Sequence, residues 1–543
     1  MKDISSTGSF IDFTLENYIY VDKTEYIPKL VKLKRVFISR PRRFGKSLTL
    51  DTIATLFETG VEPYFKGTWI YDKWTEPTYP VLRLNFLNFD KNSLEKFNNK
   101  LNSKITEFAE LNQVTTYKEK EEAEDSIDHL LEQLRLEGRQ IVILIDEYDC
   151  QMTANINNES LYKQFQEKIK SIYANIKDKF AIKFLGITGV TRLKDVSIFS
   201  VGSDIRDITN SSAYSQMIGF TRDEIKKFYI DYLKLAASYE NNCNVDEVTD
   251  TQIESLLDRL AQNYDGYCFD EFYKKKVFST WSVNTFLQSV VDKKKVQFGK
   301  YWYDNGGLPS ILVNYLKTHE LNIFEYLDKD KLLKVSDEDF KNPTSLTTIN
   351  QNVLMCQTGY LTLRSSLTES SDVFLGIPNG ELYKALNKLL ATKFFKGNIS
   401  VSNANGENIL NVGSVEDIIS LLNTMVNTVT YDAYPLNSES AVQNYVKAYK
   451  LGAKQNVFSE IHQAKGRADF DLMIETNKCR IVIEFKYAKD ETEAKTKLNE
   501  AIEQIKTRDY GNIVPRKDEL LRIATVFNAD PKVRAFTQYK FVQ

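Results

Sequence analysis

Residues 36–50 read VFISRPRRFGKSLTL, and this stretch decides the fold of the amino-terminal part of the chain. A short apolar run is followed by a basic loop, by Gly45-Lys46-Ser47 and then by a helix-like run. A strand, a tight loop and a helix in this order are the context that a phosphate-binding P-loop requires. The usual pattern starts with a glycine, and this chain has Arg40 at that position. The stretch therefore predicts a nucleotide site whose loop begins unusually.

Each part of this motif has a chemical task. Backbone N–H groups of the loop and the amino end of the next helix can hold phosphate oxygens. Lys46 is expected to reach the β- and γ-phosphates, and Ser47 to ligate Mg²⁺. The basic run could be an ordinary solvated cluster, but inside the loop we expect at least one of its three arginines to face the phosphates. The candidate nucleotide-binding residues of the loop are Arg40, Arg42, Arg43, Phe44, Gly45, Lys46, Ser47 and Leu48.

A second stretch, IVILIDEYD (141–149), supplies the acidic half of such a site. A buried parallel strand is nearly continuously apolar, so its carboxylates belong at its exit. We expect Asp146 to bind Mg²⁺ and the nucleotide, and Glu147 to act as the catalytic residue that orients an attacking water.

A third apolar run lies in AIKFLGITGVTRL (181–193) and ends in polar side chains. Ligands of open α/β sheets bind outside the carboxyl ends of the strands. The residues there are Thr188, Thr191 and Arg192. Two readings stay open: they sense the γ-phosphate, with Arg192 as a nucleotide contact, or they are a polar strand exit with a surface arginine.

The pattern along the chain indicates several domains. Strand-like and helix-like stretches alternate over about the first 230 residues, which implies a parallel sheet covered by helices. The clearest helix is expected at 118–138, because Gly138 is a typical helix end. From about 222 to 335 the pattern is mainly helical, 427–440 is the best linker candidate, and 438–543 reads as a helix-strand-strand-helix block.

Composition excludes several classes of protein. The chain has 543 residues and a net charge of −3, so it has no large uniform basic field. No apolar run approaches the roughly 20 residues of a membrane span, and the first residues lack a secretory signal, so we expect a cytoplasmic protein without membrane contact. The five cysteines are scattered, which favours free thiols. With only three histidines, a catalytic metal is expected on carboxylates.

A second constellation lies near the carboxyl end. In IVIEFKY (481–487), strand alternation puts Glu484 and Lys486 on one face and Ile483 and Phe485 on the other. Phosphodiester hydrolysis needs a carboxylate that holds a hard cation and a group that stabilises developing negative charge. We therefore predict that this face is catalytic.

A further carboxylate is expected from the preceding strand. The stretch GRADFDLMIE (466–475) offers Asp469 and Asp471, which lie two residues apart and so on one face. The spacing of either residue to Glu484 suits a hairpin that turns at ETNK (475–478). The residues alone leave both aspartates open as the metal ligand.

These motifs resemble a family of bacterial proteins that join an AAA-type ATPase-like domain to a C-terminal PD-(D/E)XK nuclease domain. The resemblance implies that Arg40 is a regular form of this loop, and that the core is related to signal-transducing and initiator-type AAA proteins with a helical lid. The matching stretches are YVDKTEYI (20–27), SRPRRFGKSL (39–48), LIDEYD (144–149), TGVTRLKDVSIFS (188–200), GFTRDEI (219–225), YDGYCF (264–269), QTGYLTL (357–363) and IPN (377–379).

The resemblance also implies roles in the carboxyl-terminal domain. The G-R-x-D sequence of the family matches residues 466–469, which favours Asp469 as ligand and keeps Asp471 as the alternative. The first-helix acid of the superfamily maps to Glu439, with Glu460 as the second candidate. The candidate nuclease residues are Glu439, Asp469 and Glu484 for the metal, and Asp469, Glu484, Lys486 and Gln504 for catalysis, with Gln504 positioning water or phosphate.

The sequence thus predicts an α/β multidomain protein. The expected domains are a P-loop AAA-type parallel sheet (1–225), a helical lid (226–335), a mixed connecting domain (336–430) and a PD-(D/E)XK restriction-endonuclease-like domain (431–543).

Two functions are consistent with these motifs. The first is an ATPase that regulates a nuclease acting on DNA or RNA, with ATP and Mg²⁺ as cofactors and Mn²⁺ as an alternative metal at the nuclease site. A role in phage defence or mobile-element biology is an association that such a pairing suggests. The alternative is a nucleotide-switched scaffold whose last domain only binds nucleic acid or a protein. AAA-type sites often receive an arginine from a neighbouring subunit, which is compatible with a homo-oligomer.

Overall fold

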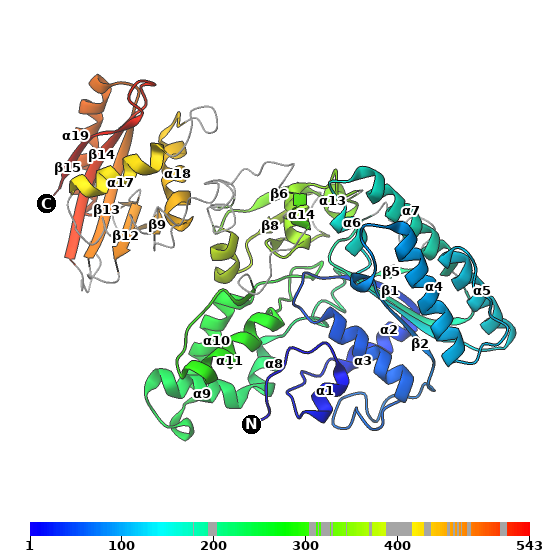
Figure 1. Cartoon of the computed structure of the whole chain (residues 1–543). Coiled ribbons are helices and arrows are strands. Elements are labelled where there is room, and N and C mark those ends of the chain that lie inside the picture. Colours follow the sequence, from blue (N-terminus) through cyan, green and yellow to red (C-terminus); the bar gives the residue numbers. More distant parts are fainter. Residues whose placement is uncertain are drawn as a thin grey trace. The chain divides into compact units, whose positions relative to one another are not determined.

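The computed structural model of the chain contains two compact units, Met1–Leu321 with Asp330–Tyr383 and Asn322–Lys329 with Lys384–Gln543 (Figure 1). The four-part division expected from the sequence stays a prediction, and the passage from the first unit to the second falls within its connecting segment. The structure describes residues 1–176, 179–193, 204–302, 311–312, 314–315, 326, 329–343, 345–368, 372–386, 415–427, 436–452, 457–459, 462–463, 466–467, 470–474, 479–510 and 519–542. The expected linker 427–440 therefore lies partly outside the described residues.

The first unit is built on a five-stranded sheet in the order β2-β3-β4-β1-β5, in which every neighbouring pair is parallel. The strands are β1 (Arg35–Ser39), β2 (Val81–Asn85), β3 (Ile141–Asp146), β4 (Ile182–Gly189) and β5 (Arg206–Asp207). The parallel sheet predicted from the alternating pattern is confirmed. Since the central strands run in parallel, the segments that leave β1, β3 and β4 meet at one edge of the sheet.

Helices cover this sheet, as Figure 1 shows, with α4, α5 and α7 forming one group and α3 lying apart from them. The helical elements are α1 (Phe10–Leu15), η1 (Thr24–Tyr26), α2 (Ile27–Leu33), α3 (Lys46–Thr59), η2 (Phe86–Asn88), α4 (Leu94–Leu111), α5 (Ala123–Leu136), α6 (Cys150–Ala154) and α7 (Glu159–Ile176). All six residues of β3 are buried, which agrees with its continuously apolar sequence.

Helix α5 ends as the sequence predicted but begins later than expected. Gly138 has a φ of 67°, and its N–H donates to the carbonyl of Arg135 at 3.1 Å, which is a glycine helix end. The expected start at 118 was wrong because side chains bind the backbone there instead. The amide of Asn102 donates to the carbonyl of Lys120 at 2.9 Å, and the N–H of Lys120 donates to Ser126 Oγ at 2.9 Å.

A helical bundle follows the sheet, as the pattern from 222 onward predicted. Thr221 with Glu224 and Thr249 with Gln252 form capping boxes, which satisfy the free N–H groups at two helix starts. The apolar faces of the bundle share one core with Ile19 from the amino-terminal segment. The elements are α8 (Arg222–Phe228), α9 (Ile230–Asn241), η4 (Val245–Glu247), α10 (Asp250–Tyr264) and α11 (Thr280–Lys293).

The rest of the first unit is a small antiparallel sheet in the order β6-β8-β7. Its elements are β6 (Leu333–Ser336), α13 (Asp337–Lys341), α14 (Gln351–Gln357), β7 (Thr362–Leu363) and β8 (Asp372–Gly376). Residues 380–386 are helical and carry the chain from the first unit into the second.

The second unit has a five-stranded sheet in the order β15-β14-β13-β12-β9, with β13 and β14 parallel and the other pairs antiparallel. Its elements are α17 (Val415–Asn427), α18 (Glu439–Gly452), β9 (Val457–Ser459), β10 (His462–Gln463), β11 (Gly466–Arg467), β12 (Phe470–Ile474), β13 (Cys479–Ala488), α19 (Glu491–Arg508), β14 (Glu519–Asn528) and β15 (Ala535–Phe541). The two expected helices, α18 and α19, are present, but among the described residues five strands (β9 to β13) rather than two lie between them, and β14 and β15 follow.

The hairpin predicted before Glu484 is also present. Strand β12 pairs antiparallel with β13, from Phe470 opposite Ile483 to Ile474 opposite Cys479, and the turn itself lies outside the described residues. Among the described residues, no helix is both long enough and apolar enough to cross a bilayer.

Candidate functional site

The loop between β1 and α3 has the backbone of a tight turn. Gly45 caps α3 with a φ of 101°, a conformation that favours glycine. Arg43 has a φ of 70°, which is uncommon for a residue with a side chain. The expected strand-loop-helix context is confirmed, with the loop occupying residues 40–45.

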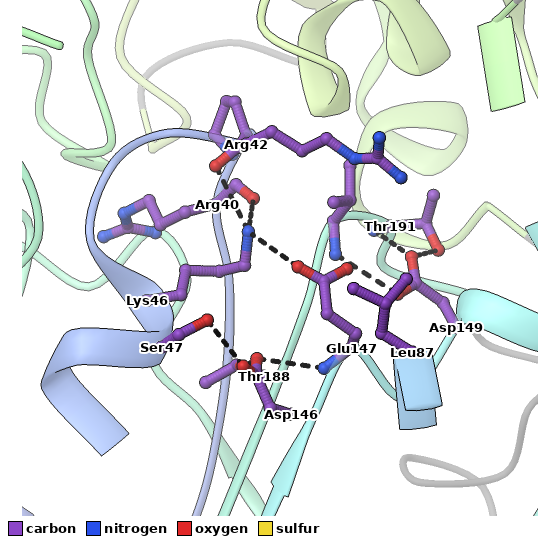
Figure 2. Close-up of polar contacts among 12 residues, drawn as sticks. Arg40, Arg42, Lys46, Ser47, Leu87, Asp146, Glu147, Asp149, Thr188 and Thr191 are labelled. Atoms are coloured by element: carbon purple, nitrogen blue, oxygen red, sulfur yellow. Dashed lines mark hydrogen bonds and ion pairs between the residues drawn. The ribbon is translucent and has the colours of Figure 1, made fainter. Parts of the chain in front are cut away.

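Lys46 ties this loop to the end of β3. Its side chain is buried, and Nζ donates to the carbonyl oxygens of Arg40 at 3.0 Å and Pro41 at 3.2 Å. The same atom lies 3.7 Å from Oε1 of Glu147 (Figure 2). The ammonium group is therefore held at the mouth of the loop, where it can neutralise a phosphate.

Asp146 accepts hydrogen bonds from three donors that lie in three different segments. The Ser47 hydroxyl donates to Oδ2 at 2.6 Å, and the Thr188 hydroxyl donates to Oδ1 at 2.5 Å. The backbone N–H of Glu147 also donates to Oδ1 at 3.0 Å. Two adjacent oxygen ligands, a hydroxyl and a carboxylate, suit Mg²⁺, so the residues present fit the metal that the motif implies.

Glu147 lies beside this group in an unusual backbone conformation, with a φ of 51°. Burial raises the pKa of its carboxyl group, and the positive charge of Lys46 opposes this effect. Asp149 and Asp146 add to the increase in pKa, and Arg42 lowers it. A carboxyl group whose pKa is raised in a cleft is a candidate general base.

Asp149 is a site residue that the sequence reasoning missed. It is buried, and its Oδ2 accepts the N–H of Thr191 at 2.7 Å and the hydroxyl of Thr191 at 2.6 Å. The last residue of β4 is also packed closely against this segment, since a Cβ added at Gly189 would lie 2.5 Å from the side chain of Tyr148. Asp149 therefore fixes the segment after β4 against the end of β3, a role that its position in IDEYD could have suggested.

Two of the three residues that could sense phosphate make other contacts. Thr191 bonds Asp149, as described above. Arg192 pairs with Asp207 and donates to the carbonyl of Lys341, and its backbone N–H donates to Gln357 Oε1 at 3.2 Å. Of the three residues, Thr188 is the one that contacts Asp146, through the hydrogen bond described above.

The three loop arginines take three different directions. The Arg40 side chain is buried, donates to the carbonyl of Thr209 at 2.6 Å and lies 4.1 Å over the ring of Phe269. The guanidinium of Arg43 lies 3.8 Å over the ring of Trp281. Arg42 extends over the side of the site where Glu147 lies (Figure 2). That one of them contacts phosphate stays a prediction, for which Arg42 is best placed.

A pocket opens beside the loop, between the amino-terminal segment, α3 and the helical bundle. Its volume is about 160 Å³. A cavity of about 150 Å³ is enough to accept a benzene ring, so a flat ring can enter this pocket. The walls are mostly apolar and include Tyr20, Phe44, Leu48, Phe220 and Trp281. Phe44 and Leu48, predicted as nucleotide-binding residues, thus line a pocket next to the P-loop.

The second unit contains a cluster of charged side chains at the start of α18 and along β13, which consists of Glu439, Glu484 and Lys486. Lys486 Nζ lies 3.0 Å from Oε1 of Glu484 and 3.6 Å from Oε1 of Glu439. The other oxygen of Glu439 accepts the N–H of Tyr487 at 3.3 Å. Glu484 is only 1% exposed. The predicted pairing of Glu484 and Lys486 on one strand face is present, and Ile483 packs into the core on the other face.

The remaining predicted nuclease residues are less well placed. Gln504 Nε2 donates to the hydroxyl of Tyr510, just beyond the end of α19, at 3.0 Å, and no contact of Gln504 with Glu439, Glu484 or Lys486 is found among the described residues. Asp469 and Glu460 lie outside the described residues, and of Asp471 only the backbone, in β12, is described. In the described part of the chain no three His, Cys, Asp or Glu residues cluster as a metal site.

Two family models match the two ends of the chain. Residues 5–199 match the family described as "Predicted AAA-ATPase", and residues 437–536 match the PD-(D/E)XK nuclease superfamily. The chain joins an AAA-ATPase-like domain to a PD-(D/E)XK nuclease superfamily domain. The resemblance inferred from the sequence motifs is thereby confirmed, and so is the α/β multidomain fold class.

Known proteins similar to this two-domain chain include one that it matches over nearly its whole length. The "uncharacterized protein in vnfD 5'region" of Azotobacter chroococcum mcd 1 is 25% identical over 537 residues, which are 95% of this chain and 94% of that protein. Among solved structures, the Walker-type ATPase paby2304 of Pyrococcus abyssi is 12% identical and covers 68% of this chain and 96% of its own, with a TM-score of 0.36. The Aeropyrum pernix Orc1 protein in complex with DNA is 9% identical and covers 71% and 98%, with a TM-score of 0.28.

Proposed function

We propose that this protein is an ATP-regulated nuclease, which hydrolyses ATP in its first unit and cleaves DNA or RNA in its second. The observation that carries the proposal is the pairing of two charged sites in one chain. Ser47 and Asp146 meet at 2.6 Å in the first unit, and Lys486 and Glu484 meet at 3.0 Å in the second. Both arrangements suit phosphate chemistry.

In the ATPase-like domain the base and the phosphates have separate places. The apolar pocket beside Phe44 suits adenine, and Lys46 would bind the β- and γ-phosphates. Ser47 and Asp146 would hold Mg²⁺, which neutralises phosphate charge when bound. Glu147 orients the attacking water and accepts its hydrogen bond, for which its carboxyl group has to be ionised.

In the nuclease-superfamily domain the acids and the lysine have different tasks. Glu484 and Glu439 would hold Mg²⁺ or Mn²⁺, which supplies Lewis-acid catalysis when bound. Asp469 is the proposed further ligand, and Asp471 is its alternative. Lys486 stabilises the negative charge that develops on the scissile phosphate. Gln504 is proposed only as a residue that positions water or phosphate from α19.

Nucleic acid is the proposed partner because phosphodiesters are the substrates that this acid–lysine group suits. A homo-oligomer is compatible with the first unit, where a neighbour could supply an arginine. A role in phage defence or mobile-element biology is proposed as an association with this domain pairing.

The test uses the full-length protein with Mg²⁺ or Mn²⁺ on single- and double-stranded DNA and RNA, with and without ATP. Cleavage by the parent should disappear in a Glu484→Gln, Lys486→Ala double variant. Lys497→Ala is the matched control, since that lysine makes only a surface pair with Glu500 on α19. Binding of nucleic acid without cleavage by the parent would instead indicate the scaffold function.

A further inference from the structure

Two of the stretches that carry the family resemblance contact the P-loop and a third packs on the first of them, although none of the three contains a residue of the nucleotide chemistry. They are YDGYCF (264–269), QTGYLTL (357–363) and IPN (377–379). Phe44 is buried and packs edge-to-face on Tyr267, with ring centroids 4.7 Å apart. The P-loop therefore packs against segments that lie hundreds of residues downstream of it.

The larger residues of this loop make contacts that glycines could not make. Arg40 lies over Phe269, as described above. Pro41 packs on Gly359 so closely that a Cβ there would lie 2.8 Å from the proline Cβ. The guanidinium of Arg43 lies over Trp281, as described above, and its backbone carbonyl also accepts the Thr280 hydroxyl at 3.0 Å, a contact that any residue could make. These contacts of Arg40, Pro41 and Arg43, which do not involve Lys46, are called the outer side of the loop.

Trp302 connects this outer side to a buried carboxylate. Its indole Nε1–H donates to the carbonyl of Arg42 at 3.2 Å, and its backbone N–H donates to Oε1 of Glu381 at 2.7 Å. The other oxygen of Glu381 accepts the Ser282 hydroxyl of α11 at 2.7 Å. Trp302 and Glu381 are both almost completely buried, so their hydrogen bonds are protected from water.

Glu381 also has a special place in the chain. It belongs to the helical residues 380–386, and the passage from the first unit to the second falls after Tyr383. If the P-loop changed its path at Arg42, the indole of Trp302 and the carboxylate of Glu381 would therefore pass this change on to residues 380–386, which lead into the second unit. Coupling between sites is carried by chains of packed side chains and hydrogen bonds, and Arg42, Trp302, Glu381 and Ser282 form such a chain.

We propose that Trp302 and Glu381 are positioning residues that hold the P-loop in its nucleotide-binding path and transmit nucleotide occupancy to residues 380–386. This inference rests on the proposed ATP binding and adds the regulation of that site. Nucleotide binding and the order of the 380–386 segment are then linked, so each stabilises the other.

The test compares full-length Trp302→Phe and Glu381→Gln with the parent. Trp302→Phe removes the indole donor and keeps an aromatic ring, and Glu381→Gln keeps the size of the side chain. Trp74→Phe is the matched control, because that indole packs on Phe57 and its Nε1 has no hydrogen-bond partner within the described part of the chain. A net hydrogen bond corresponds to about a five-fold change in an equilibrium constant.

We expect both variants to bind a slowly hydrolysed ATP analogue about five-fold more weakly, and Trp74→Phe to bind like the parent. At saturating analogue, hydrogen exchange at 380–386 should slow in the parent and in Trp74→Phe but not in the other two. Without nucleotide, exchange at 40–45 should be faster in Trp302→Phe than in Trp74→Phe.

Two results would overturn this inference while leaving ATP binding intact. One is equal affinity in Trp302→Phe and Trp74→Phe, and the other is no effect of nucleotide on 380–386 in the parent. A parent that binds no ATP would refute the proposed function instead. In that case the nucleotide-free exchange at 40–45 still decides whether Trp302 positions the loop.

Discussion

The Ser47 hydroxyl donates a hydrogen bond of 2.6 Å to the Asp146 carboxylate, although the two residues are 99 positions apart in the sequence. This contact joins the basic loop motif to the acidic strand motif. It places a hydroxyl and a carboxylate side by side at the edge of the parallel sheet. These are the two side chains that we propose hold Mg²⁺ beside the phosphates of a nucleotide.

Lys46→Ala and Glu147→Gln should separate binding from hydrolysis. Lys46→Ala removes the ammonium group at the mouth of the loop, so ATP affinity should fall at least ten-fold, as expected for a lost charge-assisted contact. Glu147→Gln should bind ATP normally but lose at least about 100-fold in kcat, in the range typical of general acid–base catalysis. Calorimetry and a phosphate-release assay measure the two effects. Normal turnover in Glu147→Gln would remove this residue from the mechanism.

The pH profile of ATP hydrolysis should report the buried carboxyl group of Glu147. Burial raises its pKa, so the protonated, inactive form persists to higher pH than for an exposed glutamate, whose pKa is about 4.3. Activity should be present above the raised pKa and be lost as the pH falls through it. The measurement is the acid limb of kcat/KM, which reports the free enzyme.

Arg42 offers a second variant for the same profile. Its charge lowers the pKa of Glu147, so Arg42→Met should move the acid limb to higher pH. A limb that stays in place, or moves to lower pH, would show that another group titrates.

Asp149→Asn should destabilise the first unit. The carboxylate accepts two hydrogen bonds from Thr191, and bonds to a buried charged group contribute about 1.5–3 kcal/mol. Thr191→Val removes only the hydroxyl bond and should cost about 1 kcal/mol. Urea unfolding measures both, and Thr153→Val is the control, because the bond that this buried hydroxyl makes within the described residues is local, to the carbonyl of Cys150 at 3.0 Å. Equal stability of parent and Asp149→Asn would contradict this role.

Arg40→Gly restores the glycine of the usual P-loop pattern, yet it should destabilise this protein. The change removes a buried side chain from Phe269 and leaves the carbonyl of Thr209 without its donor, which together should cost about 2–4 kcal/mol. Arg40→Met refills most of the space and should cost less. Thermal or urea unfolding of the full-length chain gives the comparison, and a glycine variant as stable as the parent would refute it.

The sequence predicted the parallel sheet, the P-loop, Asp146 at the end of β3 and Glu484 on β13, because these features depend on local patterns. Periodicity identified β1, β2, β3 and β4, and alternation placed Glu484 and Lys486 on one face. It did not find Asp149, Trp302 or Glu381, since their roles depend on contacts between segments far apart in the chain. The pairing of Arg192 could not be predicted either: its position after β4 left a phosphate contact and a surface arginine both open, and in the structure it pairs with Asp207 of β5.

We propose that an ATP site in the first unit controls a nuclease site in the second, and cleavage measured with and without ATP tests this coupling. The parent, Lys46→Ala and the Glu484→Gln, Lys486→Ala double variant are compared on the same nucleic acids with Mg²⁺ or Mn²⁺. We predict metal-dependent cleavage by the parent that changes with ATP, cleavage by Lys46→Ala that ignores ATP, and no cleavage by the double variant. Equal cleavage by the parent and the double variant, or no response of the parent to ATP, would contradict the account.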